Sequence, residues 1–339
     1  MSQVQLDAVS EGPKIPLLTA RRLHVHFLRQ EGIIRKRDVT IKAVDDVSFD
    51  VMPSSIFTIV GESGSGKTTI ARCIMGLEKP TSGTLTYKGN EIHKLSGKAL
   101  WGYRRDVQMI FQDPFGSLNP RQDVLSAIST PIRALTEERD QTGVSKKVSN
   151  LLSEVGLEES EVLHKLPHQL SGGQRQRVNI ARALATNPKV LVADEPVTML
   201  DASQRLNILS IIMQLKTKRK LSVLLITHDL ASAKVMGGSL GVMYLGKLVE
   251  VGQTLDILSK PHHPYTELIL ASTPKLSIDS NLGSENVTSL ESSYDVKKGC
   301  MFAPRCHYAT SICREVEPEL LEKTPTHHSA CHNAINLSK

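Results

Sequence analysis

The stretch Leu170-Ser171-Gly172-Gly173-Gln174 decides how the rest of this sequence is interpreted. Taken alone, it is a turn that leads into a helix, with Ser171 as the N-cap residue. The residues that follow change this interpretation, because a helical pattern through Ala181 to Leu184 is succeeded by Val190-Leu191-Val192-Ala193-Asp194-Glu195. That last segment is a short apolar strand that ends in two carboxylates. The order of turn, helix and strand indicates a functional site that uses the two carboxylates at the end of a buried strand.

A second glycine-rich stretch, Gly61-Glu62-Ser63-Gly64-Ser65-Gly66-Lys67-Thr68-Thr69, follows the apolar run of residues 56–60 and opens a helical pattern. Strand, loop and helix in this order are the context of a Walker A phosphate-binding loop. Glycines let the backbone N–H groups approach the phosphates, and the helix N-terminus stabilises their charge. We therefore predict that these nine residues bind ATP. Lys67 is expected to reach the β- and γ-phosphates, and Thr68 to place its hydroxyl on Mg²⁺.

Together, these motifs resemble the nucleotide-binding domain of ATP-binding cassette (ABC) proteins. In this resemblance Ser171, Gly172, Gly173 and Gln174 belong to the signature motif, and the chain is an ATPase. Asp194 ends the Walker B strand and helps to hold Mg²⁺, while Glu195 is the general base for the attacking water. In isolation, such a carboxylate pair is also a helix N-terminal cap.

Three more residues receive roles from the resemblance. Gln112 is similar to the Q-loop glutamine, which serves both the catalytic site and Mg²⁺, and His228 is similar to the switch histidine. Asp201 is similar to the D-loop aspartate. Without the order of the motifs, a lone glutamine or histidine at the end of a strand is usually structural. Phe27, upstream of the Walker A loop, is the predicted stacking partner of adenine, and a place in the core is its alternative.

The apolar pattern predicts the fold class. Strand-like runs at residues 190–193 and 222–226 are separated by a helical pattern at residues 208–215, which indicates a parallel sheet with crossover helices. Residues 44–51 alternate apolar and polar, as an antiparallel strand with one wet face does. We therefore expect an α/β fold of the P-loop NTPase class. The resemblance implies a mostly parallel core sheet, an antiparallel β subdomain and a helical subdomain at about residues 113–186.

Composition divides the chain into four segments. Residues 1–20 lack periodicity and are predicted to be a flexible N-terminus, and residues 21–274 hold the nucleotide-binding domain. Residues 275–298 are polar and are predicted to be a linker. Residues 299–339 contain four of the five cysteines and form a small C-terminal module. With this module, the segment Pro261-His262-His263-Pro264-Tyr265-Thr266 resembles oligopeptide and dipeptide importer ATPases.

The C-terminal cysteines Cys300, Cys306, Cys313 and Cys331 are separated by five, six and 17 residues. Disulfides, a zinc site, a [4Fe-4S] cluster and free thiols are the alternatives. A cytosolic ATPase disfavours disulfides, and zinc sites usually contain tight C-x₂₋₄-C pairs, which this sequence lacks. A [4Fe-4S] cluster accepts four thiolates at varied spacing. We therefore predict such a cluster, which the resemblance also supports.

The net charge of the chain is modest, at +6. A nucleic-acid-binding surface would need basic stripes interleaved with stacking aromatic side chains. The chain has one Trp, six Tyr and six Phe, so nucleic acid is not an expected partner. The longest apolar runs are far below the roughly 18 residues of a membrane-spanning helix. The N-terminus shows no secretory signal.

The resemblance also implies partners. The signature motif of one subunit closes over the ATP that is bound to the Walker A loop of another, so hydrolysis requires a second ABC ATPase subunit, identical or different. We expect the chain to couple ATP hydrolysis to solute movement as a peripheral subunit on the cytoplasmic face of the inner membrane. Two transmembrane permease subunits and a periplasmic solute-binding protein complete the implied complex.

Di- and oligopeptides are the expected cargo, and nickel or oligosaccharides are the alternatives within the same subfamily. Residues 113–135 are expected to receive a coupling helix from a membrane subunit, and a core face is the alternative for their apolar positions. A non-transport ABC ATPase of a cytosolic complex, or of DNA repair, is a different class of function. Repair members carry long insertions between the Walker motifs, which do not fit in the 126 residues between Lys67 and Asp194.

Overall fold

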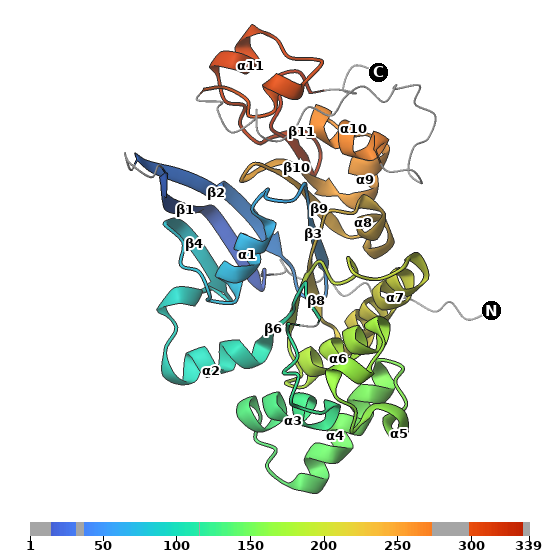
Figure 1. The fold of residues 1–339 in the computed structure, drawn as a ribbon. Coiled ribbons are helices and arrows are strands. Elements are labelled where there is room, and N and C mark those ends of the chain that lie inside the picture. Colours follow the sequence, from blue (N-terminus) through green and yellow to red (C-terminus); the bar gives the residue numbers. More distant parts are fainter. Residues whose placement is uncertain (1–14, 32–36, 115, 273–297, 335–339) are drawn as a thin grey trace, which may run out of the picture.

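The computed structural model describes residues 15–31, 37–114, 116–272 and 298–334, which form two sheets and the helices packed on them (Figure 1). In the larger sheet the strand order is β11 (Leu321–Thr324), β12 (His327–Ser329), β10 (Lys247–Gln253), β9 (Ser239–Tyr244), β3 (Ile56–Val60), β8 (Ser222–Thr227), β7 (Val190–Asp194) and β6 (Val107–Ile110). In the smaller sheet the order is β2 (Arg37–Val51), β1 (Leu18–Glu31), β4 (Ser82–Tyr87) and β5 (Asn90–Glu91).

The α-helices of the described residues are α1 (Lys67–Ile74), α2 (Gly97–Asp106), α3 (Val124–Leu135), α4 (Gln141–Glu154), α5 (Glu159–Val162), α6 (Gly172–Leu184), α7 (Ala202–Arg219), α8 (Leu230–Met236), α9 (Thr254–Ser259), α10 (Pro264–Ala271) and α11 (Ser311–Glu315). Helices α3 to α6 form the helical layer at the bottom of Figure 1. Among these helices of the described chain, none combines the length and the apolar character that crossing a membrane requires.

Five neighbouring strands of the larger sheet, β9, β3, β8, β7 and β6, are parallel. They are buried on both faces because alternate residues enter two different cores. In β7, Leu191 and Ala193 pack into one core, whereas Val190 and Val192 pack into the other. Strands covered on both faces by other elements read as continuous apolar runs. The predicted parallel sheet with crossover helices is confirmed.

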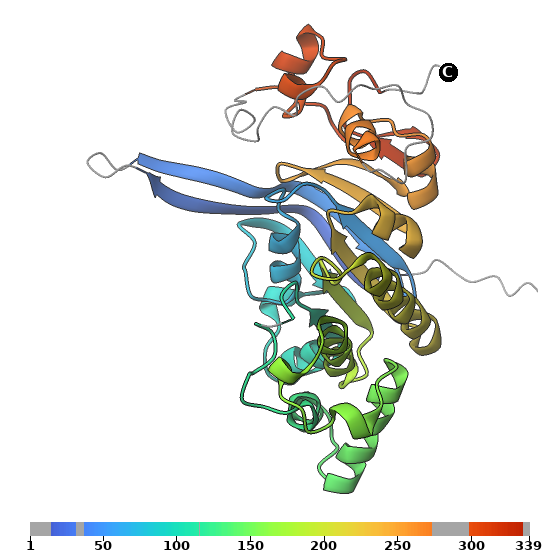
Figure 2. The same ribbon diagram turned by 45° about the vertical axis from the view of Figure 1, so that its right-hand side comes forward.

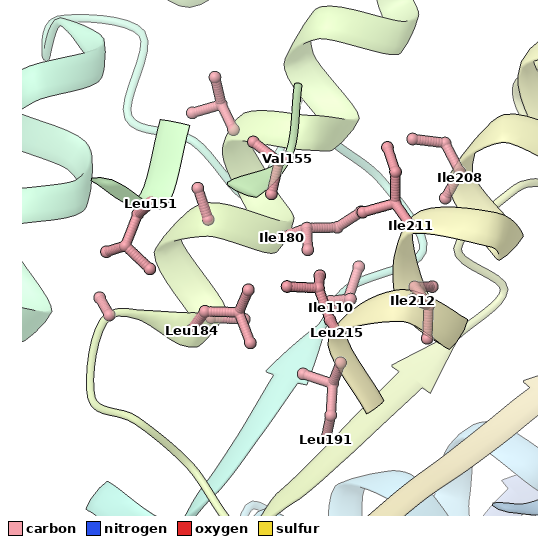
Figure 3. Packing of buried hydrophobic residues seen from close by; sticks show 14 of the residues in the cluster. Ile110, Leu151, Val155, Ile180, Leu184, Leu191, Ile208, Ile211, Ile212 and Leu215 are labelled. Atoms are coloured by element: carbon pink, nitrogen blue, oxygen red, sulfur yellow. The ribbon is translucent and has the colours of Figure 1, made fainter. Parts of the chain in front are cut away.

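Figure 3 shows part of the first core, where α4, α6 and α7 pack above β6 and β7. α7 contributes Ile208, Ile211, Ile212 and Leu215, which share one helical face. The helical pattern predicted for residues 208–215 is therefore a core face, as expected.

The apolar face of α3 also belongs to this core. Val124, Ile128 and Ile132 are at most 2% exposed and pack against α4 and α6. Of the two alternatives for this stretch, the core face is the one that the structure supports. Contact of this segment with a coupling helix stays a prediction, and these three buried side chains are not available for it.

Strands β1 and β2 form a long antiparallel hairpin that runs beyond the rest of the smaller sheet (Figure 2). Pairing starts with Leu18 opposite Val51, and both Leu18 and Ala20 are fully buried. The sheet therefore begins before the predicted boundary between residues 20 and 21, because these alternating apolar residues already face the core. Most of the predicted flexible N-terminus, residues 1–14, lies outside the described residues.

The cysteine-bearing C-terminal module is continuous with the larger sheet. β12 pairs antiparallel with β10, with Glu250 opposite Ser329, and β11 extends the sheet by one more strand. The buried His327 Nε2 lies 2.7 Å from Glu250 Oε1, which fixes this pairing inside the protein. The predicted boundary at residue 299 therefore marks a change of composition and not the edge of a sheet. The predicted linker, residues 275–298, lies outside the described residues except for its last residue.

Candidate functional site

The Walker A loop connects β3 to α1 at the carboxyl end of the parallel strands. Gly66 is the N-cap residue of α1, with a φ of 103°, and a Cβ at this position would come within 2.0 Å of the Ala43 carbonyl oxygen. Only glycine fits such a position without displacing the backbone. No side chain caps this helix, so its N-terminus is arranged as an anion-binding end.

Lys67 is buried in this loop. Its Nζ donates hydrogen bonds to the carbonyl oxygens of Gly61, over 2.8 Å, and of Glu62, over 2.7 Å. Burial lowers the pKa of Lys67, and the negative charges of Glu195, Asp194 and Glu62 oppose this effect. The ammonium group is thus held by the loop's own carbonyls, which phosphate oxygens can replace.

Asp194 ends β7 beside the first turn of α1. Thr68 Oγ1 donates a hydrogen bond to Asp194 Oδ1 over 3.4 Å. Burial, reinforced by the charge of Glu195, raises the pKa of Asp194 to about 6. A hydroxyl and a carboxylate side by side are oxygen ligands of the kind that Mg²⁺ prefers. Of the three residues predicted to hold Mg²⁺, Thr68 and Asp194 are therefore adjacent, whereas Gln112 is hydrogen-bonded to the neighbouring Glu195.

The carboxylate of Glu195 is a meeting point for three side chains. Gln112 Nε2 donates to Glu195 Oε2 over 3.3 Å, and Thr198 Oγ1 donates to it over 2.9 Å. His228 Nδ1 lies 3.2 Å from the same oxygen. Glu195 itself has a φ of 45°, a left-handed conformation that a non-glycine residue adopts only where its surroundings impose it. The structure therefore brings Gln112, Glu195 and His228 together, and it adds Thr198, which was not predicted.

A cavity of about 460 Å³ joins these groups to the Walker A loop. Its lining consists of Gly61, Glu62, Ser63, Gln112, Glu195, His228, Leu230, Ile269 and Ser272. The last three were not predicted. Ile269 lies in α10 and Ser272 directly follows this helix, far along the chain from the Walker A loop, where no local motif marks them. Phe27 does not line this cavity. It lies in β1 opposite Ile41 and is 38% exposed, so its alternative role as a core residue is wrong, and its contact with adenine stays a prediction.

The signature motif starts α6. Ser171 is its N-cap residue, and Ser171 Oγ accepts a hydrogen bond from Gln174 N over 3.2 Å. In return, Gln174 Oε1 accepts from Ser171 N over 3.0 Å, which completes a capping box. The expectation that Ser171 caps a helix is confirmed. Gly172 and Gly173 form the first turn, and a Cβ on Gly173 would meet the Gln204 side chain at 2.7 Å.

Ser171, Gly173 and Gln174 line a second hollow of about 440 Å³, together with residues that include Ser203 and Gln204 of α7. This hollow shares no lining residue with the cavity beside Glu195. Asp201 is close by in sequence, as the N-cap residue of α7, and its carboxylate accepts from Gln204 N over 2.9 Å. The chain thus carries two separate candidate nucleotide surfaces.

The four C-terminal cysteines line one small cavity of about 10 Å³. Burial raises the pKa of Cys300, of Cys306 and, to about 11, of Cys331, and the charges of neighbouring thiols act in the same direction. A cationic metal centre would lower these values. Among the described residues, side chains close enough to share a single metal ion are found elsewhere, in the groups His24, His26, Asp45 and Glu250, His262, His327.

Two family profiles match the chain. The profile described as ABC transporter matches residues 44–198, and the one described as Oligopeptide/dipeptide transporter, C-terminal region, matches residues 249–313. The oligopeptide transport ATP-binding protein AppF of Bacillus subtilis (strain 168) is 39% identical over 324 residues, which cover 93% of this chain and 97% of AppF. The dipeptide transport ATP-binding protein DppF of Haemophilus influenzae is 39% identical over 319 residues, which cover 93% of this chain and 96% of DppF.

A solved dimeric structure of the ATP-binding cassette MJ0796, in a post-hydrolysis state with ADP and Pi, has a TM-score of 0.61 and 28% identity, and the match covers 70% of this chain and 98% of that chain. Fold and site together define a P-loop ATPase that carries a signature motif. Most of the chain's length is shared with AppF and DppF. The chain belongs to the ABC transporter family, and ATP hydrolysis is its reaction.

Proposed function

We propose that this chain is the energy-coupling ATPase subunit of a membrane importer for dipeptides or oligopeptides. The likeness to AppF and DppF supports the cargo class, because it extends through both the ATPase domain and the C-terminal region. One observation carries the proposed role in ATP hydrolysis. The side chains of Gln112, His228 and Thr198 all lie within hydrogen-bond distance of Glu195, beside the cavity at the Walker A loop.

In this proposal the Walker A loop residues 61–69 hold the phosphates of ATP. Lys67 Nζ exchanges its bonds to the Gly61 and Glu62 carbonyls for phosphate oxygens. Mg²⁺, which neutralises charge on the phosphates, would be held by Thr68 and Asp194, with Gln112 as a further ligand.

Glu195 acts as the general base in the hydrolytic step. Its carboxylate takes a proton from water as the water oxygen bonds to the γ-phosphorus and the bond to ADP breaks. His228 Nδ1 lies 3.2 Å from Glu195 Oε2. In this proposal His228 orients the Glu195 carboxylate and contacts the γ-phosphate of bound ATP. Phe27 is proposed as the residue that stacks on adenine, which requires nucleotide to reach the exposed face of β1.

The second hollow, which Ser171, Gly173 and Gln174 line, is separate from the cavity beside Glu195. This separation supports a composite site, in which two subunits each contribute one part of the ATP site. Ser171, Gly172, Gly173 and Gln174 would face the ATP that is bound to a second ABC ATPase subunit, identical or different, with Asp201 beside that interface. Two transmembrane permease subunits and a periplasmic solute-binding protein complete the proposed importer. The chain is placed, in this proposal, as a peripheral subunit on the cytoplasmic face of the inner membrane.

We also propose a [4Fe-4S] cluster on Cys300, Cys306, Cys313 and Cys331. The donor set fits in kind, because four thiols line one cavity. Burial raises the pKa of Cys300, Cys306 and Cys331, and a bound cationic centre would oppose this effect. The cavity of about 10 Å³ is smaller than a cluster, so the cysteine side chains have to turn outward to hold one. Anaerobically purified protein should contain iron and labile sulfide with broad visible absorption. Protein that lacks all three would contradict the cluster.

The importer proposal is tested by reconstitution with the membrane subunits in vesicles and a panel of solutes. Di- or oligopeptides should stimulate ATP hydrolysis and accumulate in the vesicles, whereas nickel and oligosaccharides should not. The variant Lys67→Ala should abolish both activities, and Lys98→Ala, a change at an exposed lysine of α2, should leave both intact. Full transport by Lys67→Ala would refute the proposed energy-coupling role of the ATPase. Stimulation of ATP hydrolysis by another solute class would refute the proposed cargo class.

A further inference from the structure

The C-terminal region reaches the Walker A loop at Glu62. The Arg305 guanidinium donates two hydrogen bonds to the Glu62 carboxylate, from Nη1 to Oε2 and from Nη2 to Oε1, both over 3.1 Å. Tyr265 Oη accepts a hydrogen bond from the backbone N–H of Glu62 over 3.0 Å. Bidentate contacts between an arginine and a carboxylate are among the stronger and more directional pairs in proteins. We call these contacts of Arg305 and Tyr265 the Glu62 clamp.

The two side chains that contact Glu62 are fixed by burial. The Arg305 side chain is 6% exposed and lies over the rings of Tyr244 and Phe302, at 5.8 Å and 5.7 Å from their centroids. Tyr265 is fully buried and packs against Tyr244, with 4.6 Å between ring centroids. A guanidinium held by aromatic faces loses little freedom when it binds a carboxylate. The clamp is therefore a rigid contact and not a chance surface ion pair.

Glu62 occupies a position that matters for the nucleotide. The carbonyl oxygen of Glu62 accepts a hydrogen bond from Lys67 Nζ. Glu62 and Ser63 both line the 460 Å³ cavity. A shift of Glu62 therefore moves an acceptor of the lysine and the neighbouring backbone N–H groups of the loop. Such groups bind phosphate only when they are already aligned.

The clamp is also joined to the cysteine cavity. Arg305 ends the 3-10 turn Ala303–Arg305, directly before Cys306. The same turn is anchored by the hydrogen bonds from Ala303 N to Cys300 O and from Cys306 N to Ala303 O. Any group that draws Cys300 and Cys306 together acts on the turn that carries Arg305.

We propose that Arg305 and Tyr265 are positioning residues for ATP: they hold the Walker A loop in its binding conformation and link the four-cysteine cavity to the ATP site. This inference rests on the proposed ATPase function of the Walker A cavity. It concerns ATP affinity and leaves the chemical step with the groups around Glu195.

The test compares variants of the full chain, assembled with its membrane subunits, by the KM and kcat of ATP hydrolysis. Arg305→Gln should raise KM for ATP about tenfold, as expected for the loss of a charged hydrogen-bonded pair, with kcat changed less than about twofold. Arg305→Lys should restore part of the affinity, because one charged hydrogen bond can be remade. Arg314→Gln, at an exposed arginine of α11 in the same region, should behave like the wild type.

A double-mutant cycle separates positioning from simple destabilisation. In a Glu62→Gln background, Arg305→Gln should raise KM by less than about twofold, because its charged partner is already gone. Equal effects of Arg305→Gln in both backgrounds would overturn the clamp, as would a fall in kcat without a change in KM. Binding of a fluorescent ATP analogue to the isolated full chain provides the same comparison without turnover.

The two proposals fail in different ways. If the wild-type complex hydrolyses ATP and Arg305→Gln keeps a wild-type KM, the clamp is refuted and the proposed function stands. If the wild-type chain binds the ATP analogue with the expected coupling of Arg305 and Glu62, but the complex does not hydrolyse ATP, the proposed function is refuted and the clamp stands.

Discussion

Replacing Asp194 with asparagine should stabilise the nucleotide-free protein while it removes a proposed magnesium ligand. Asp194 is 2% exposed, and burial together with the charge of Glu195 raises its pKa from 3.8 to about 6. The cost of keeping this carboxylate ionised in the fold at neutral pH is therefore on the order of 3 kcal/mol. Asparagine keeps an oxygen for Thr68 and carries no charge, so we expect a gain of about 1 to 3 kcal/mol in the free energy of unfolding.

The pH dependence follows from the same values. Between about pH 4 and about pH 6 the folded protein holds a proton on Asp194 that the unfolded chain has lost, so this residue's contribution to stability falls as pH rises through that window and stays low above it. The advantage of the asparagine variant should thus be full at about pH 7.5 and shrink to about a third at about pH 4.5.

The assay is urea denaturation of the nucleotide-free full chain at both pH values, supported by the thermal midpoint, which should rise by about 2 to 6 °C at neutral pH. Asp256→Asn, at an exposed position of α9, is the control and should change neither quantity. Adding ATP with Mg²⁺ should reverse the order of stability, since only the wild type gains the full binding energy. An Asp194→Asn variant that is no more stable than the wild type at neutral pH, or equally favoured at both pH values, would refute the reasoning.

Three further outcomes are expected. Glu195→Gln should lower ATP hydrolysis about 100-fold or more while ATP binding persists, as loss of a general base does, and Glu137→Gln, at an exposed glutamate, should have no effect; retained turnover would contradict the assignment. Ser171→Arg should leave ATP binding by the isolated chain intact and abolish hydrolysis in the assembled complex, and a loss of binding in the isolated chain would argue against a composite site. Gly66→Ala should lower the thermal midpoint and ATP binding, because its Cβ meets the Ala43 carbonyl oxygen, whereas Gly102→Ala, whose Cβ meets nothing within 4 Å, should raise the midpoint slightly; equal behaviour of the two variants would contradict the steric argument.

The resemblance predicted Gln112, Glu195 and His228 as members of one site, and the sheet explains why they meet. Gln112, Glu195 and His228 follow β6, β7 and β8, which are consecutive neighbours in the parallel sheet. Carboxyl ends of parallel strands meet at one edge, so side chains just beyond them converge even when they are 83 or 33 positions apart. Thr198 was missed although it is only three residues from Glu195, because a hydroxyl in a turn has many local partners and no sequence pattern selects one.

The start of the smaller sheet was predicted less well for a related reason. Leu18 and Ala20 are separated by a polar residue and followed by two arginines, so the apolar alternation is too short to predict a strand from sequence alone. What makes these residues part of the sheet is pairing on both sides, with β2 and with β4. Phe27 shows the converse case, because an aromatic residue in a strand suggests a core position, yet here it lies on the exposed part of the hairpin.

The contact between the C-terminal region and the Walker A loop lies beyond what local sequence can supply. Glu62 and Arg305 are 243 positions apart, and each is a charged residue of a type that is usually solvated. Their pairing depends on β10, α10 and β12, which carry the chain back along the larger sheet and place Tyr265 under the loop. Cysteine spacing therefore predicts a metal centre but not the turn between Cys300 and Cys306 that presents Arg305. Two of the four cysteines that look like a separate module in sequence, Cys300 and Cys306, therefore flank the turn whose arginine contacts the Walker A loop.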